Sequence, residues 1–136
     1  KNRGNRIGKE VKKKIMLGTF VLSEGYYDAY FTKAQQVRNL LVSLTKEIFS
    51  QFDAILLPTV PSTAFTAGSM DNDPIAMYLA DIYTVYANLT GIPGISLPLF
   101  KHSNNMPFGV QLLTNKYNEL TLLELSEMLL RNYKRY

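Results

Sequence analysis

The segment from Asn88 to Pro98, which runs Asn-Leu-Thr-Gly-Ile-Pro-Gly-Ile-Ser-Leu-Pro, restricts the fold of this 136-residue chain more than any other. Gly91 suits the left-handed residue that ends a helix, and Pro93 cannot continue a helix because its nitrogen carries no hydrogen. The apolar run Ile95–Leu97 is too short for a helix and is typical of an interior strand. The segment therefore predicts a helix, a tight turn and a buried strand in direct succession.

A second strand with the same context occurs earlier in the chain. The run Asp53-Ala-Ile-Leu-Leu-Pro-Thr follows a long helical pattern and is again short and apolar. Strands of this kind, each preceded by a helix, are typical of a sheet that helices cover on both sides. We therefore expect an α/β fold with a mixed sheet and helices on both faces. A third strand, Phe108–Leu113, is expected beside Ile95–Leu99, because only a short loop separates them.

The helices are predicted from apolar residues that recur at three- and four-residue steps. They are expected over Gly8–Leu22, from Ser23 or Glu24 to Phe52, over Pro74–Leu89, and after Asn118, which can cap the last helix. Asp73 and Pro74 suit a helix start, since the carboxylate can cap the first amides and proline has no amide hydrogen to satisfy. The period of the second helix would also fit a coiled coil. We favour a helix laid across the sheet, because strand patterns flank it.

The same steps predict which side of each helix faces the core. The second helix should present Tyr27, Tyr30, Ala34, Val37, Leu41, Leu44 and Ile48. The third should present Ile75, Leu79, Ile82, Tyr86 and Leu89, and the last should dock through Leu120, Leu123, Met128 and Leu130. The polar stretch Thr59–Asn72 is expected to be a surface loop, either a functional crossing or a plain connection.

Composition is that of an ordinary globular segment. The chain is 46% hydrophobic, contains no cysteine, and has no apolar run near the length of a membrane span, which is about 18 residues. Disulfides and thiolate metal sites are therefore excluded. We expect one segment, residues 1–136, in a cytoplasmic setting.

The net charge of +4 is concentrated at the beginning of the chain. Its positive residues there are Lys1, Arg3, Arg6, Lys9, Lys12, Lys13 and Lys14. Such an arm could neutralise nucleic-acid phosphates, or it could be a solvated helix face. We favour the solvated face, because the arm has no aromatic residue to stack on bases.

The residue types that usually carry catalysis are poorly placed here. His102 lies in a polar connection with no nucleophile or second metal ligand nearby, and a surface-loop histidine is the better interpretation. Ser96 precedes Leu97 and Pro98, so it lacks the glycine-flanked turn of a hydrolase nucleophile. We expect no catalytic residue and no metal ligand in this chain.

Several motifs in fixed order resemble the C-terminal part of amidase-signature enzymes, and within that family the glutamine-hydrolysing subunits of tRNA-dependent amidotransferases. The resemblance runs from about Gly8 to about Leu130. Besides the two strand segments, it rests on Ile15-Met-Leu-Gly-Thr-Phe, Gly25-Tyr-Tyr-Asp-Ala-Tyr, Asp73-Pro74, Met77-Tyr78 and Pro107-Phe-Gly-Val-Gln-Leu. The serine- and glycine-rich stretch that carries the family's nucleophile is not present in this sequence.

The resemblance implies that this segment is part of an enzyme whose reacting groups lie elsewhere. An upstream Ser-Ser-Lys set would release ammonia from glutamine, for conversion of Glu-tRNA(Gln) or Asp-tRNA(Asn) to Gln-tRNA(Gln) or Asn-tRNA(Asn). The partners would be subunits B and C of a heterotrimer, with tRNA, ATP and magnesium handled mainly by one of these partners. The segment alone would be inactive. The alternative is another amidase-signature hydrolase that acts on a different amide.

The resemblance also implies two substrate-binding residues. In the family an aspartate receives the α-ammonium of glutamine, and it falls here on Asp81 of Met77-Tyr78-Leu79-Ala80-Asp81. An arginine that binds the α-carboxylate falls on Lys14, which keeps the charge but loses the planar two-pronged geometry. From the residues alone, Asp81 is a carboxylate among apolar neighbours that needs a partner, and a structural hydrogen bond would serve as well as a ligand. Lys14 alone would be taken for a solvated charge.

Overall fold

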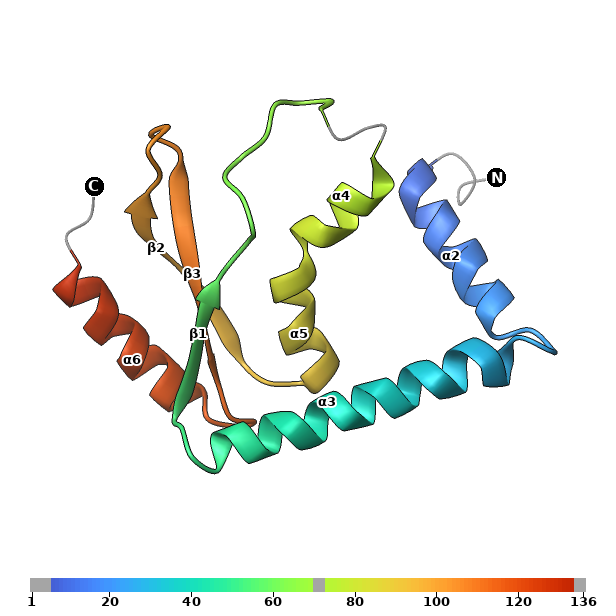
Figure 1. Ribbon diagram of the computed structural model, residues 1–136, viewed down its shortest axis with the longest axis horizontal. Helices are drawn as coiled ribbons and strands as arrows, with labels where there is room; N and C mark the ends of the chain where they lie inside the picture. Colours follow the sequence, from blue (N-terminus) through green and yellow to red (C-terminus); the bar gives the residue numbers. More distant parts are fainter. Residues whose placement is uncertain (1–5, 70–72, 134–136) are drawn as a thin grey trace. The chain divides into compact units, whose positions relative to one another are not determined.

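The computed structural model describes residues 6–69 and 73–133 and has an α/β fold, as expected. The chain divides into two compact units, Lys1–Leu40 and Leu41–Tyr136. In chain order the elements are α2 (Lys9–Val21), η1 (Tyr27–Thr32), α3 (Lys33–Phe49), β1 (Ala54–Pro58), α4 (Pro74–Ala80), α5 (Ile82–Thr90), β2 (Gly94–Lys101), β3 (Pro107–Thr114) and α6 (Glu119–Asn132) (Figure 1).

The first unit contains α2, η1 and the beginning of α3. The helix α2 matches the expected one within a residue at each end. The second helix differs from expectation, because Gly25 has a positive φ of 83° and residues 27–32 form a π-helix before α3 begins. Since only the turn after Gly25 allows helical geometry to start, the expected start at Ser23 or Glu24 was wrong. Ring packing orders this turn, with the centroids of Phe20 and Tyr26 4.2 Å apart.

The second unit is built on a three-stranded sheet in the order β1-β3-β2. The central strand β3 is antiparallel to both neighbours, so β1 and β2 run in the same direction on either side of it. The expectation of a mixed sheet was therefore wrong for the described strands, because the two parallel strands are separated by β3 and do not pair with each other. Leu113 lies opposite Ile55 of β1 and Gly94 of β2. The predicted pairing of the second and third strands is therefore confirmed. The predicted left-handed end of a helix at Gly91 is also confirmed, since α5 ends there with a φ of 70°.

Helices cover both faces of this sheet, as the sequence predicted (Figure 1). Neighbouring residues of a strand point to opposite faces, so Val110 and Gln111 mark the two sides. Val110 belongs to the apolar core against which Leu129 and Leu130 of α6 pack. On the other side, the Gln111 Nε2 atom donates a hydrogen bond of 3.1 Å to the Tyr83 carbonyl oxygen of α5. The central strand is therefore buried on both faces from Val110 to Thr114.

Close approach at Gly94 explains the glycine that opens β2. A Cβ atom at this position would lie 2.6 Å from the Cδ2 atom of Leu113 and 3.8 Å from the Cβ atom of Ala87. Leu113 is fully buried, with 0% of its surface exposed, so it has no room to withdraw. The absence of a side chain at Gly94 thus allows Leu113 to fill the space between the sheet and α5.

The core-facing stripes expected for the second and the last helix were wrong within the described residues. In α6 the buried residues are Leu122 and Ser126, whereas Leu120, Leu123 and Met128 are exposed and only Leu130 docks as expected. Leucines occupy both sides of this helix, so periodicity alone did not select the face. In the second helix Tyr27, Tyr30, Val37, Leu44 and Ile48 are exposed, and the buried residue of α3 is Thr45.

The last helix does begin after Asn118, but the Asn118 Oδ1 atom accepts a hydrogen bond from the Thr121 hydroxyl instead of from a backbone amide. In residues 6–69 and 73–133, no helix has the length and apolar character needed to cross a membrane.

We predict that Leu113→Ala lowers the free energy of unfolding by about 2–5 kcal/mol, because it leaves a cavity in the most buried part of the sheet. Leu113→Met conserves volume and should lower it by less than about 1.5 kcal/mol. Urea denaturation followed by circular dichroism measures both. Equal effects of the two substitutions would contradict the assignment of Leu113 to the centre of the core.

Candidate functional site

The helix expected over Pro74–Leu89 is interrupted at Asp81. This residue has φ −98° and ψ 3° and lies directly after α4 and directly before α5. Its amide donates to the Tyr78 carbonyl oxygen at 3.3 Å, and its carbonyl oxygen accepts from the Val85 amide at 3.1 Å. The prediction of one continuous helix was therefore wrong, and Asp81 lies at the junction of two shorter helices.

The interruption also changes which residues of the two helices are buried. Of the expected stripe, Ile75, Leu79, Ile82 and Leu89 are exposed. Tyr86 is partly covered, and its hydroxyl shares a hydrogen bond with the Thr45 hydroxyl of α3. The buried residue of α5 is Thr90. A change of helix direction at Asp81 is not visible in the apolar period, so the sequence stripe assumed one straight helix.

The beginning of α4 follows the predicted capping. The Asp73 Oδ1 atom accepts a hydrogen bond from the Ala76 amide at 3.0 Å, and Pro74 occupies the first turn. A carboxylate at this position satisfies an amide that has no partner inside the helix, and it is also favourable to the helix dipole. The cap therefore fixes where α4 begins.

A small pocket of about 230 Å³ lies between α4 and that loop. Asp81 supplies the one carboxylate among the described lining residues, and most of the remaining lining is apolar. The lining residues are Val60, Ser62, Thr63, Ala64, Phe65, Met77, Ala80 and Asp81. Of the two interpretations of the loop given by the sequence, its position in the wall of this pocket favours the functional crossing. The individual roles of Ser62, Thr63 and Phe65 were missed, because loop composition does not indicate which side chains turn inward.

The Asp81 carboxylate is exposed, and it has no hydrogen bond or ion pair to any residue that the structure describes. The expectation that it needs a structural partner among apolar neighbours therefore does not apply to the described chain. An exposed carboxylate keeps its hydration and is stable without a partner. Its position at the pocket wall leaves both oxygens available to a cationic group of a ligand.

Lys14 lies on α2 in the first unit, and its side chain is exposed. A nearby charge pair is formed by Lys13 and Glu10, whose Nζ and Oε2 atoms are 3.9 Å apart. Lys14 itself has no ion pair with the described residues. Because Lys14 and Asp81 belong to different units, a shared binding site for the two remains a prediction.

The loop beside the pocket is tied to the sheet at two points. At its beginning, the Thr59 amide donates to the Gly109 carbonyl oxygen at 3.1 Å, and the hydroxyls of Thr59 and Ser96 are 2.8 Å apart. Further along, the Asn104 Nδ2 atom donates to the Thr63 Oγ1 atom at 3.2 Å. Ser96 is thus a strand residue with a structural bond, as expected.

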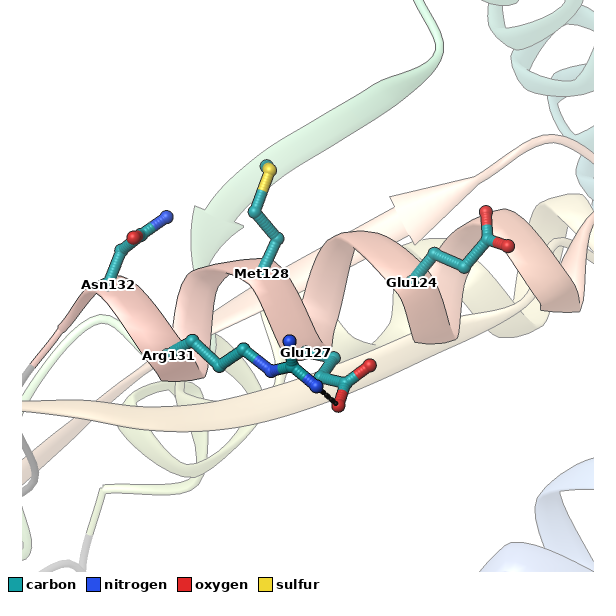
Figure 2. Close-up of a pocket in the computed structure, with 5 residues that line it drawn as sticks. All are labelled: Glu124, Glu127, Met128, Arg131 and Asn132. Carbon is teal, nitrogen blue, oxygen red and sulfur yellow. Dashed lines mark hydrogen bonds and ion pairs between the residues drawn. The ribbon is translucent and has the colours of Figure 1, made fainter.

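The outer surface of α6 carries a shallow hollow of about 250 Å³ (Figure 2). Its described lining residues all come from this one helix. The Arg131 guanidinium is paired with the Glu127 carboxylate at 2.5 Å. The pairing neutralises the charge that an anion would need. A larger hollow of about 340 Å³ is almost wholly apolar and is lined by Ile48, Ile55, Leu57, Ile82, Tyr83 and Tyr86.

The remaining candidates from the sequence, His102 and a possible metal site, do not form a binding site among the described residues. His102 lies in the exposed turn between β2 and β3, where the Ser103 hydroxyl is 3.3 Å from its Nδ1 atom. Among the described residues, no group of three or more His, Asp or Glu side chains is placed to hold a metal ion. The Asp81 pocket is therefore the site with the clearest potential to bind a charged small molecule.

The sequence and the fold together define the class of protein. A family model described as Amidase matches residues 1–123, which is most of the chain. The chain belongs to the amidase family. This agrees with the motifs that the sequence presents from α2 to β3.

The relatives narrow the comparison further. The A subunit of glutamyl-tRNA(Gln) amidotransferase from Streptococcus gordonii is 49% identical over 124 residues, which make up 91% of this chain and 25% of that protein. The corresponding protein of Koribacter versatilis is 48% identical over 126 residues, with 93% and 26% covered. The chain therefore spans about a quarter of the length of these curated relatives.

Solved structures support the same grouping. The crystal structure of the glutamyl-tRNA(Gln) amidotransferase A subunit from Thermotoga maritima matches 97% of this chain and 29% of that chain, with a TM-score of 0.76 and 42% identity. A 6-aminohexanoate cyclic dimer hydrolase matches 83% of this chain and 25% of its own, with a TM-score of 0.69 and 21% identity. At that identity the likeness shows the fold alone.

We predict that Asp73→Ala destabilises the start of α4 by about 1 kcal/mol, since the Ala76 amide loses its acceptor. Asp73→Asn should preserve the cap, because asparagine is as good a helix cap as aspartate. Hydrogen exchange of the α4 amides measures the difference. Faster exchange in the alanine variant alone is expected, and equal protection in both variants would contradict the capping role.

Proposed function

We propose that this chain is the C-terminal part of the glutamine-hydrolysing subunit of a tRNA-dependent amidotransferase. The observation that carries the proposal is the Asp81 carboxylate in the wall of a small, largely apolar pocket. This carboxylate has no hydrogen bond or ion pair to any described residue. A free amino acid needs such a carboxylate for its ammonium group and apolar walls for its methylene groups. The resemblance to glutamine-hydrolysing subunits supports glutamine as that amino acid, and it agrees with the amidotransferase name of the relatives.

In the proposed enzyme, this segment binds and orients glutamine and does not supply the reacting groups. A serine outside this segment, assisted by a second serine and a lysine, attacks the side-chain amide carbon. The carbon–nitrogen bond breaks, and the nitrogen takes up a proton and leaves as ammonia. Water then releases glutamate from the serine ester. The contribution of Asp81 is to hold the zwitterionic end, so that the amide reaches the serine in a fixed position.

Two opposite charges would hold the zwitterion. Asp81 accepts hydrogen bonds from the α-ammonium group, and Lys14 donates to the α-carboxylate. Charge-assisted hydrogen bonds of this type are roughly twice as strong as neutral ones. A lysine binds a carboxylate as a point charge and not as a planar fork, so it orients the substrate less strictly than an arginine would.

The proposed complex contains further components beyond this chain. Subunits B and C are the proposed partners in a heterotrimer, and one of these partners uses ATP and magnesium to activate glutamyl- or aspartyl-tRNA for amidation by ammonia. The tRNA is bound mainly by that partner, and the complex works in the cytoplasm. The name of the relatives, which designates an A subunit, supports a complex of several subunits. The identities of the other components come from the resemblance described above.

We predict that Asp81→Ala and Lys14→Ala in the assembled complex each raise the KM for glutamine by about tenfold to hundredfold, because each removes a hydrogen bond to a charged group. Asp81→Asn should resemble the alanine variant, since it keeps the shape but not the charge. Lys14→Arg should retain glutamine use, because the cation remains. Steady-state glutaminase assays measure these changes.

The matched control supplies ammonium chloride in place of glutamine as the nitrogen donor. Product formation from ammonium should be the same in all variants, because it bypasses glutamine hydrolysis. An unchanged KM for glutamine in Asp81→Ala would contradict the proposed binding site. If the full-length protein instead hydrolyses a different amide and does not bind glutamine, the alternative of another amidase-signature hydrolase is correct.

We also predict that the purified 136-residue chain has only background glutaminase activity. The reason is that the sequence contains no serine- and glycine-rich stretch to supply the nucleophile. An ammonia-release assay against a buffer blank tests this. Turnover that rises in proportion to the concentration of the chain would show that the reacting groups lie within this segment.

A further inference from the structure

The turn between β2 and β3 reaches the wall of the Asp81 pocket through one side chain. Asn104 lies in this turn, and its Nδ2 atom donates to the Thr63 Oγ1 atom at 3.2 Å. Thr63 is one of the residues that line the pocket, on the wall that faces α4. The turn and the pocket both belong to the second unit. A residue far from Asp81 in the sequence is therefore in direct contact with the pocket wall.

The Asn104 side chain is also held in place through its amide oxygen. Its Oδ1 atom accepts a hydrogen bond from the Met106 amide at 3.1 Å. The turn is closed by backbone bonds of 2.9 Å from the His102 amide to the Met106 carbonyl oxygen and from the Asn105 amide to the His102 carbonyl oxygen. Because both ends of the Asn104 amide are engaged, the donor that points to Thr63 has a defined direction.

Two sets of hydrogen bonds tie the described part of the loop that carries Thr63 to the sheet and to its β2–β3 turn. Thr59 anchors its beginning to the sheet. Further along, the bond from Asn104 joins the pocket wall to the β2–β3 turn. Loops are positioned by the scaffold to which they are bonded. Loss of this bond would release the wall that faces Asp81, while the sheet below would keep its own bonds.

We propose that Asn104 is a positioning residue for the amino-acid pocket. It acts through Thr63, holding the segment of residues 60–65 at a fixed distance from Asp81, and does not touch the substrate. This inference rests on the proposed function, since it assumes that the pocket binds the zwitterionic end of glutamine. It adds the β2–β3 turn to the elements that determine glutamine affinity.

The test uses the assembled full-length complex and steady-state glutaminase kinetics. Asn104→Ala and Thr63→Val should each raise the KM for glutamine by about threefold to tenfold, which corresponds to the net contribution of one hydrogen bond. The value of kcat should change by less than about twofold, because the reacting groups lie elsewhere. The double variant should be no worse than the more affected single variant, since both substitutions break the same bond.

Two matched variants distinguish a positioning role of Asn104 from a general loss of stability in the turn. Thr63→Ser keeps the hydroxyl that accepts from Asn104 and should recover most of the glutamine affinity that Thr63→Val loses. Ser103→Ala changes the neighbouring residue of the same turn, whose hydroxyl lies against His102 and not against the pocket wall, and should leave the KM unchanged. Activity with ammonium chloride as the nitrogen donor should be equal in all variants, and thermal denaturation checks that each variant is folded.

The outcomes distinguish this inference from the proposed function. Additive effects of the two substitutions, a loss confined to kcat, or an unchanged KM in Asn104→Ala would overturn the positioning role while leaving glutamine binding at Asp81 intact. An unchanged KM in Asp81→Ala would overturn the proposed function, and the role of Asn104 would be refuted with it. A raised KM in Ser103→Ala would show that the turn acts through general stability and not through Thr63.

Discussion

The burial of β3 on both faces is the constraint on which the second unit depends. Its side chains from Val110 to Thr114 alternate between the layer under α6 and the layer under α5, so both helices take their positions from one strand. The same strand pairs with β1 and β2 and fixes their register. The pocket wall is attached to this framework, since Thr59 bonds to Gly109 of β3. The geometry around Asp81 is thus set by packing that lies largely outside the pocket.

The features that sequence alone predicted are those set by neighbouring residues. The left-handed end at Gly91 and the cap at Asp73 both depend on backbone geometry and on hydrogen bonds within a few positions, and both are confirmed. The strands were recognisable for a similar reason, because a short apolar run between turn residues has few alternatives. The α/β class follows from these local elements.

The features that sequence missed depend on contacts between distant segments. The interruption at Asp81 leaves no mark in an apolar period that is compatible with one straight helix. The face by which α6 docks was ambiguous, because leucines lie on several sides, and only contact with the sheet selects Leu129 and Leu130. The bond between Asn104 and Thr63 joins positions 41 residues apart, which no local pattern indicates. The relation between Lys14 and Asp81 is of this same long-range kind and stays a prediction.

The helical segment is divided into α4, whose Met77 and Ala80 line the pocket, and α5, which packs against the sheet through Tyr83. One straight helix would have to do both with a single helical register. In a continuous helix, inserting or deleting a single residue rotates everything beyond it by about 100° relative to what precedes it. Here the helical register restarts at Asp81, so α5 keeps Tyr83 against Gln111 independently of the register of Met77 and Ala80. A change of length within α4 would therefore alter the surface that faces the pocket without rotating α5 against the sheet.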